Sequence, residues 1–293
     1  MTRTTAATST SLRAAARARS RRRTILLHSF LLLAITLMLY PLVWLVVSSL
    51  RPNELIFSDP TLLPSGLTLD NYIQGWSAHA VSFAVYFGNS AFVTVAAILG
   101  NLLACSLAAY AFARLRFKLK TMWMAILLGT IMLPEHVTIV PQYVLFSELG
   151  WINTFLPLVA PKFFATDAFF VFLIVQFIRT LPRELNEAAE IDGCGQFAIY
   201  RRIVLPLIVP ALATTAIFTF IWTWNDFFRP LVFLTDARLY TVPMALRLFV
   251  DAQAGTNWGA LFAMSVLSLI PVFLFFIFGQ RFLIRGIATT GLK

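Results

Sequence analysis

The chain alternates long apolar stretches with shorter polar connections. Roughly 20 mainly apolar residues are needed to cross about 30 Å of hydrocarbon, and unpaired backbone amides are costly in lipid, so each long stretch is expected to be a helix. The pattern therefore predicts an all-α membrane protein with six transmembrane helices, at approximately 25–49, 86–112, 121–141, 155–178, 205–224 and 260–282.

The composition agrees with this prediction and refines it. The chain is 59% hydrophobic and 12% charged, beyond the apolar share of soluble domains. The net charge of +10 raises the possibility of nucleic-acid binding, but eighteen of the 23 basic residues fall on one side of the six-helix arrangement. The positive-inside rule then places both termini and the second and fourth loops in the cytoplasm. The distribution of charge therefore predicts how the chain is oriented in the membrane, and it predicts no nucleic acid as partner.

Three parts of the chain differ in composition. Residues 1–24 form a basic arm rich in Ala, Arg, Ser and Thr, predicted to be disordered and to touch anionic lipid. Residues 25–282 form one transmembrane domain, and residues 283–293 form a cytoplasmic tail. Prolines loosen several of the predicted spans, because each removes a backbone donor: Pro134, Pro141, Pro157, Pro161, Pro206 and Pro210.

The polar segment 183–206 between the fourth and fifth spans has a helix-like pattern. Glu187 and Glu190 lie three residues apart on one helix face, near an N-terminus whose dipole favours acidic side chains. Gly193 allows a sharp turn into a second helix, which is expected to end at Arg201-Arg202. Leu205-Pro206 are expected to set the angle at which the chain re-enters the membrane. The segment thus predicts a helical hairpin offered to a soluble partner.

The same segment resembles the signature loop of bacterial ATP-binding-cassette (ABC) importer permeases. That loop reads Glu-Ala-Ala, three residues, Gly, nine residues, Ile, any residue, Leu-Pro, and all seven specified positions match over 187–206. Further stretches are similar to carbohydrate-type permeases, specifically the smaller permease of the maltose-transporter pair: 109–114, 141–153, 182–185, 224–226 and 286–293.

The resemblance implies the type I ABC importer permease fold, in a bacterial plasma membrane, with a coupling helix between spans 4 and 5. It implies a second, larger permease, two ATP-binding-cassette ATPases and an extracytoplasmic solute-binding protein as partners, and a C-terminal tail that reaches toward the ATPases. The chain has no Gly-rich phosphate loop, so ATP and Mg²⁺ are expected on the ATPases and no cofactor here. The residues assigned to ATPase coupling are Glu187, Ala188, Ala189, Asp192, Gly193, Ile203, Leu205 and Pro206.

Polar residues within or beside the spans are candidates for the solute pathway, because ionisable groups in lipid are costly. The candidates are Glu135, Asp167, Trp224, Asn225 and Asp226. Two other interpretations stay open: mutual pairing of the charged groups, and an aromatic belt at the membrane interface. In the maltose-type pair most direct sugar contacts come from the larger permease, which would leave this chain as wall and gate.

The expected solute is a sugar or oligosaccharide. Glycerol 3-phosphate or a glycerophosphodiester is the alternative, since positive charge is available from Lys162, Arg229, Arg238 and Arg247. A membrane-embedded enzyme is disfavoured because the three histidines form no HExxH pair and no G-x-S-x-G elbow is present. An ion-coupled transporter would want acidic residues in mid-membrane and repeat symmetry, and both signals are weak.

Overall fold

The structure is a computed structural model that describes residues 4–58, 66–250 and 256–290. Every regular element in that part of the chain is a helix, which confirms the all-α prediction. Four helical segments are long and apolar enough to cross a membrane, and two bent pairs raise the total to six if each pair crosses once. The longest helices are α1 (Thr4–Ser49), α3 (Phe83–Arg114) and α14 (Trp258–Thr290).

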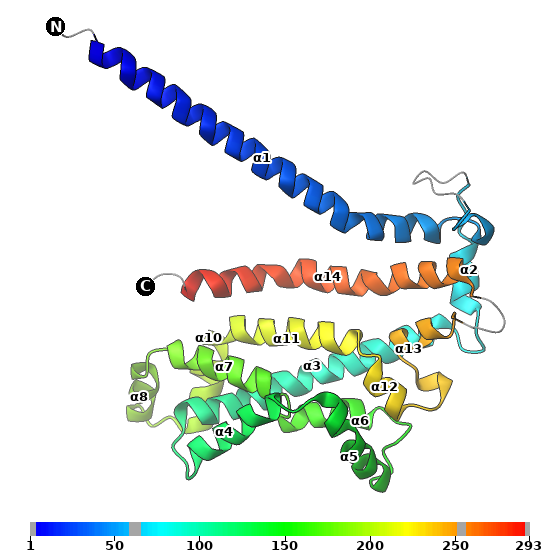
Figure 1. Cartoon of the computed structure of the whole chain (residues 1–293). Coiled ribbons are helices and arrows are strands. Elements are labelled where there is room, and N and C mark those ends of the chain that lie inside the picture. The colour runs from blue at the N-terminus through cyan, green and yellow to red at the C-terminus, as the bar shows by residue number, and fades with distance from the viewer. Residues whose placement is uncertain (1–3, 59–65, 251–255, 291–293) are drawn as a thin grey trace.

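Helix α1 begins well before the predicted start of the first span. The basic arm, predicted to be disordered, is helical from Thr4 onward and continues into the span without a break (Figure 1). Ala and Arg are strong helix formers, which is the physical reason for this continuation. At 1.5 Å per residue, the 46 residues of α1 extend about 69 Å, more than twice the hydrocarbon thickness.

The third apolar stretch is sharply bent. It forms α4 (Lys120–Ile131) and α5 (Glu135–Glu148), whose axes differ by 105°. Pro134 precedes α5 and lacks the N–H that would continue the ladder of α4, and it disfavours helical geometry at the residue before it. A straight span over 121–141 is therefore wrong in its second half.

The fourth apolar stretch is interrupted as well. It consists of α6 (Leu156–Val159), the 3₁₀ helix η2 (Ala160–Phe164) and α7 (Ala168–Thr180). Ala165 adopts the left-handed conformation with φ +54°, which separates η2 from α7. Pro157 and Pro161 lie in the first turns of α6 and η2, where the backbone N–H has no partner within the helix, so its absence breaks no hydrogen bond.

The fifth apolar stretch contains a bend of 75°. Helix α10 (Leu205–Leu207) precedes Ile208, and α11 (Val209–Trp224) follows it. The predicted span of 205–224 therefore begins inside the element before the bend. Pro206 lies in the first turn of α10, so the change of direction occurs at Ile208 and not at Leu205-Pro206.

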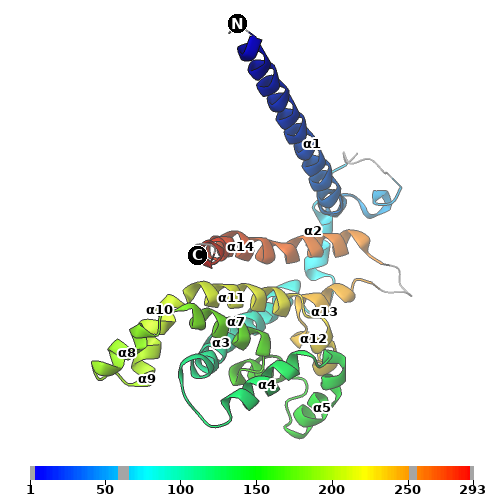
Figure 2. The same ribbon diagram turned by 60° about the vertical axis from the view of Figure 1, so that its left-hand side comes forward.

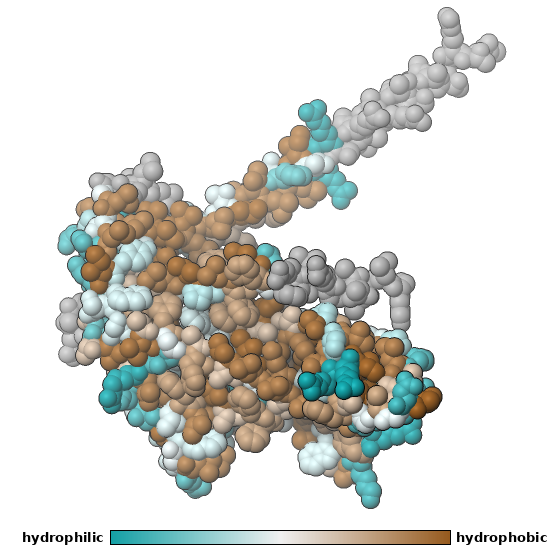
Figure 3. Space-filling view, turned by 180° about the vertical axis from the view of Figure 1, so that it is seen from behind, coloured by the Kyte–Doolittle hydropathy of each residue, from teal (hydrophilic) through white to brown (hydrophobic). Residues whose placement is uncertain are grey.

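Helix α3 lies at the centre of the molecule. It packs against α7, α11 and η2, whereas α14 packs against α11, α2 and α1 (Figures 1 and 2). A Cβ atom at Gly100 would lie 2.9 Å from Cδ2 of Phe163, so this glycine permits the close approach of η2 to α3. Apolar side chains cover the middle of the surface and polar ones gather toward its ends (Figure 3), as expected for a chain that crosses lipid.

Short helices close the end of the bundle at which α14 begins. One of them is α2 (Asp70–Ser77). Asn71 of α2 donates to the carbonyls of Ser49 at 2.9 Å and Arg51 at 2.6 Å, and thereby fixes the end of α1. The other helices at this end are η1 (Asn53–Leu55), α12 (Phe228–Phe233), η4 (Ala237–Leu239) and α13 (Val242–Arg247).

Candidate coupling hairpin and polar clusters

Residues 184–207 form a helical hairpin at the end of the molecule where α7 ends. The first arm is α8 (Glu184–Ile191), and the second runs through α9 (Gln196–Ile199), the π-helix η3 (Tyr200–Val204) and α10. The hairpin projects beyond the bundle (Figures 1 and 2). The predicted helix–turn–helix is confirmed, but its second arm does not end at Arg201-Arg202, because η3 carries the helix on into α10.

The turn between the arms requires glycine. Gly193 has φ +77°, where a side chain would be strained by about 1–2 kcal/mol. The amide of Cys194 donates to the Ala189 carbonyl at 2.9 Å, and the Gly193 amide donates to the Glu190 carbonyl at 3.0 Å. This pair of bonds is a Schellman motif, which satisfies the last carbonyls of α8. The glycine of the signature loop therefore fixes the angle between the two arms.

The motif residues divide between the surface and the core. Ala189 is buried, and Ile203 and Leu205 pack against the same core cluster from partly buried positions. Glu187, Ala188, Asp192 and Pro206 are exposed on the hairpin. The buried and partly buried members thus anchor the hairpin to the bundle, and the exposed members are available to a partner.

Ile191 and Phe197 are the two most exposed of the large apolar side chains on the hairpin. Ile191 is 86% exposed at the end of α8, and Phe197 is 67% exposed in α9. Large apolar side chains this exposed in a polar segment that projects from the molecule are candidates for a contact surface. The motif analysis did not single them out, although two bulky apolar residues amid charged neighbours were the available signal.

Hydrogen bonds join the hairpin to α3. The Tyr110 hydroxyl donates to Oε1 of Gln196 at 2.8 Å, and Nε2 of Gln196 donates to Oε1 of Glu190 at 2.7 Å. A second bond links the hydroxyls of Ser106 and Tyr200 at 2.7 Å. Both arms of the hairpin are therefore connected to the central helix. None of these partners was predicted, because they lie 86 or more residues from α3 along the chain.

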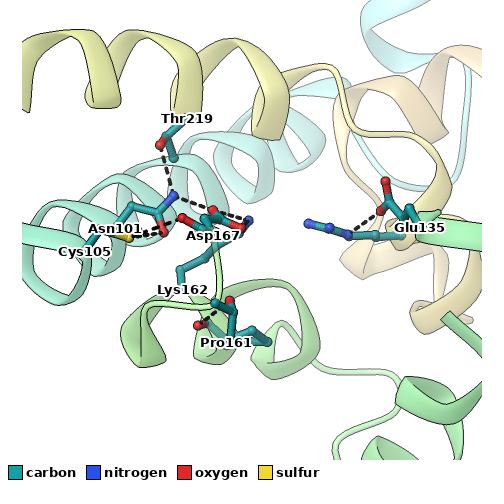
Figure 4. A network of polar contacts seen from close by, with 9 residues as sticks. Asn101, Cys105, Glu135, Pro161, Lys162, Asp167 and Thr219 are labelled. Atoms are coloured by element: carbon teal, nitrogen blue, oxygen red, sulfur yellow. Dashed lines mark hydrogen bonds and ion pairs between the residues drawn. The ribbon is translucent and has the colours of Figure 1, made fainter. Parts of the chain in front are cut away.

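A polar cluster lies at the break before α7 (Figure 4). Lys162 Nζ is 2.8 Å from Oδ2 of Asp167, and Asn101 Nδ2 donates to the same oxygen at 2.7 Å. Asn101 also donates to Thr219 at 3.0 Å. Asp167 precedes the 13 residues of α7, so it lies about 20 Å from the end that leads into the hairpin. The cluster thus joins four elements, η2, α7, α3 and α11, inside the bundle.

A second charged group follows the bend before α5. Arg229 Nε lies 2.7 Å from Oε1 of Glu135, and the Arg229 amide donates to Oδ1 of Asp226 at 3.1 Å. Burial raises the pKa of the Asp226 carboxyl, and the Arg229 charge partly opposes that shift. Glu135, Asp167 and Asp226 therefore lie among paired charges, which is the arrangement expected if these groups stabilise one another.

The other two pathway candidates lie apart from these clusters. Trp224 is only 4% exposed, donates to the Ser268 carbonyl at 3.2 Å and stacks on Phe220, so it is a core residue here. Asn225 is exposed and donates to the Ile221 carbonyl at 2.8 Å. Asn89 joins α3 to the η4 segment, since its side chain donates to two backbone carbonyls there.

The long apolar helices and the two bent pairs are those of a multi-pass membrane protein. The chain belongs to the family described as binding-protein-dependent transport system inner membrane component, whose model matches residues 100–289. It is thus the permease component of a binding-protein-dependent ABC importer.

Known proteins resemble the chain over nearly its full length. It is 33% identical to the trehalose/maltose transport system permease protein MalG of Thermococcus litoralis, over 93% of this chain and 97% of that protein. It is 32% identical to the sn-glycerol-3-phosphate transport system permease protein UgpE of Brucella abortus, over 90% and 95%. A solved bacterial ABC transporter for alginate import shares the fold, with TM-score 0.80, 22% identity and coverage of 90% and 97%.

Proposed function

We propose that this chain is one of two different permeases in an ATP-driven importer of sugars or oligosaccharides. The second permease, two ATPases and an extracytoplasmic solute-binding protein complete the assembly. The family description supports dependence on a binding protein, and the trehalose/maltose and alginate systems support a carbohydrate as solute. ATP and Mg²⁺ bind to the ATPases, and this chain contributes movement of its helices rather than chemistry.

The hairpin is the observation that carries the proposal. Its exposed Glu187, Ile191 and Phe197 are available to a cleft of an ATPase subunit. Its hydrogen bonds through Gln196 and Tyr200 connect that surface to α3, which packs on three other membrane elements. A closing ATPase dimer shifts the transporter toward one state only if it binds that state more tightly, and a rigid hairpin transmits this difference.

Both termini lie in the cytoplasm in this proposal, and the outer ends carry few cations. The hairpin then lies on the cytoplasmic side together with Arg114, Lys120 and Arg183, as the positive-inside rule requires. The tail 283–293 would reach toward the ATPases from the same side; helix α14 continues through it to Thr290, and residues 291–293 lie outside the part of the chain that the structure describes.

The solute pathway in this proposal runs along the outer halves of the third, fourth and fifth spans. The paired charges of Asp167 and Glu135 support a role as wall and gate, because a paired carboxylate has fewer free acceptors for sugar hydroxyls. Asn225 is exposed and keeps its side-chain oxygen available for transient hydrogen bonds. Selection among sugars belongs to the solute-binding protein.

Glycerol 3-phosphate is the second candidate solute, and the relation to UgpE favours it. The charges favour a neutral sugar. Lys162, Arg229 and Arg238 are each paired with a carboxylate, at 2.8, 2.7 and 2.6 Å. Arg247 is exposed and forms no salt bridge in the part of the chain that the structure describes. A phosphate at Lys162, Arg229 or Arg238 would therefore have to displace an existing ion pair, which leaves Arg247 as the one cation of the four without an ion pair among the described residues.

Uptake of labelled sugars and of glycerol 3-phosphate by cells carrying the complete transporter tests the proposal. Glu187→Lys should lower uptake at least about tenfold, equivalent to about 1.4 kcal/mol of lost coupling, while the protein reaches the membrane in normal amount. Glu148→Lys, in α5, is the matched control and should transport normally. Normal uptake and normal stimulated ATPase activity in Glu187→Lys would refute the coupling role, and uptake of glycerol 3-phosphate alone would reassign the solute.

A further inference from the structure

A hollow of about 720 Å³ lies between the base of the hairpin and the helices beside it. The end of α3, the start of α4 and the start of α8 each contribute a wall. Four basic side chains line it: Arg114, Arg116, Lys120 and Arg183. Polar residues of the hairpin line the other side, Asn186, Glu187, Glu190 and Gln196. Cations from three separate elements thus converge on one open space.

The positive charge in this hollow is not neutralised by the protein. Within the described residues, none of the four cations lies within 4.0 Å of a carboxylate, whereas Lys162 and Arg229 elsewhere are paired. Arg183 lies near enough to Arg114 and to Lys120 to repel both. The two glutamates on the hairpin side leave an excess of two positive charges. A concave site with such an excess attracts anions.

The backbone holds two of these cations in place. Arg114 donates to the carbonyls of Ile178 at 3.1 Å and Leu181 at 2.8 Å, at the end of α7. Lys120 donates to the Leu115 carbonyl at 2.9 Å across the connection between α3 and α4. Their positions are therefore set before a ligand arrives, which lowers the entropic cost of binding.

Exposed apolar side chains lie next in the chain to two of the cations, Arg116 and Lys120. Leu119 is 62% exposed, and Trp123, one helical turn along at the start of α4, is 51% exposed. Phe117 in the same connection is 40% exposed. A ligand that combines a phosphate with an apolar chain would place the phosphate in the hollow and the chain on these apolar side chains, whereas a free anion would occupy only the hollow.

We propose that the hollow binds the phosphate of an anionic phospholipid, with an acyl chain along Leu119 and Trp123. Basic pockets at the ends of membrane helices are suited to such headgroups. The bound phosphate would join the α3–α4 connection to Arg183 at the start of the hairpin, and so steady the hairpin at its base. This site goes beyond import itself, because nothing in the transport cycle requires it.

Native mass spectrometry of the purified full-length chain, titrated with phosphatidylglycerol, measures the site directly. Arg116→Gln with Lys120→Gln should weaken binding about tenfold, because each basic residue beside an anionic headgroup contributes on the order of a fivefold factor before screening. Arg201→Gln with Arg202→Gln is the matched control, since it removes two exposed cations from the hairpin outside the hollow. It should bind as the unmodified chain does.

Further arms identify the ligand and exclude trivial losses. Exchanging the two cations, Arg116→Lys with Lys120→Arg, keeps the charge and should preserve binding. Phosphatidylcholine and inorganic phosphate should bind poorly. Equal loss in the control pair, unchanged phosphatidylglycerol binding in the Arg116–Lys120 variant, or inorganic phosphate binding as well as the lipid would each overturn the proposal. So would displacement of the lipid by added ATPase subunits, because the hollow would then belong to an acidic side chain of that partner. The assay measures lipid binding and not transport, so a negative result would leave the proposed transport function untouched.

Discussion

The hydroxyl of Tyr110 in α3 donates a 2.8 Å hydrogen bond to Oε1 of Gln196, at the start of the hairpin's second arm. Gln196 in turn donates to Glu190 in the first arm at 2.7 Å. A single amide side chain therefore joins the central membrane helix to both arms of the hairpin. A force applied to the hairpin passes into α3 along this route and along the parallel bond between Ser106 and Tyr200.

Tyr110→Phe should loosen this connection without unfolding the chain. One neutral hydrogen bond contributes about 0.5–1.5 kcal/mol, so the ratio of solute imported to ATP hydrolysed should fall several-fold. Solute uptake and phosphate release in reconstituted vesicles measure that ratio. Tyr143→Phe in α5 removes a hydroxyl that forms no hydrogen bond among the described residues and should leave it unchanged; an equal ratio in both variants contradicts the connection.

Gly193→Ala should damage coupling far more than Gly195→Ala. Both glycines lie in the turn of the hairpin with open space around them, but Gly193 has φ +77° and Gly195 has φ −72°. Alanine at 193 is strained by about 1–2 kcal/mol and alanine at 195 is not. Uptake at equal membrane amount is the measurement. Similar uptake by both variants would show that the left-handed turn is not required.

Asp167→Asn should destabilise the protein because Lys162 would remain buried without a counter-charge. The Lys162 and Asp167 side chains are only 11% and 21% exposed, and removing one partner of such a pair costs about 3–5 kcal/mol. Adding Lys162→Met should restore much of the loss. Thermal unfolding in detergent tests this, and a double variant no more stable than Asp167→Asn would show that the pair does not act as a unit.

The free energy of unfolding should fall as the pH rises, because the Asp226 carboxyl ionises more readily in the unfolded chain than in the folded one. Burial raises the pKa of this carboxyl above its ordinary value of 3.8, so the folded state holds a proton that the unfolded state has lost. Between the two pKa values, raising the pH therefore favours unfolding. Asp226→Asn should remove this component from the profile of unfolding temperature as the pH rises above about 4. An unchanged profile would contradict the shift.

The orientation can be tested with single cysteines. Lys118→Cys lies between α3 and α4, and Leu149→Cys, 50% exposed, lies after α5. An impermeant thiol reagent added outside the cell should label 149 and not 118. Position 149 is preferable to Gly150, whose φ of +69° would strain a cysteine. Cys194 must first be replaced, since it is partly exposed. Labelling of both positions from outside would refute the arrangement.

The sequence predicted those features that depend on local pattern. Span positions followed from apolar runs, and the turn at Gly193 followed from a glycine between two helical patterns. The 105° bend at Pro134 was not predictable, because a proline signals a break but not its angle. Nor was the burial of Trp224, since the same aromatic residue is typical of an interface belt and of a core.

Contacts between segments that are far apart in the chain could not be predicted from the sequence. Mutual pairing of Lys162 and Asp167, which are five residues apart, was one of the interpretations left open. The hydrogen bond from Asn101 to Asp167 was not, because Asn101 lies 66 residues away along the chain. The hydrogen bond from Asn101 forms because the Asp167 carboxylate, which follows the break at Ala165, lies beside α3. The route through Tyr110 and Gln196 has the same origin, in the packing of the hairpin on α3.

The bend at Pro134 also bears on how the chain enters the bilayer during synthesis. Helix α4 has 12 residues and extends about 18 Å, well short of the roughly 30 Å of hydrocarbon. Such a segment cannot be stable in lipid as an isolated helix. It must leave the translocon together with neighbouring helices that cover its exposed ends, so the third crossing is completed by assembly within the membrane and not by the insertion of one segment.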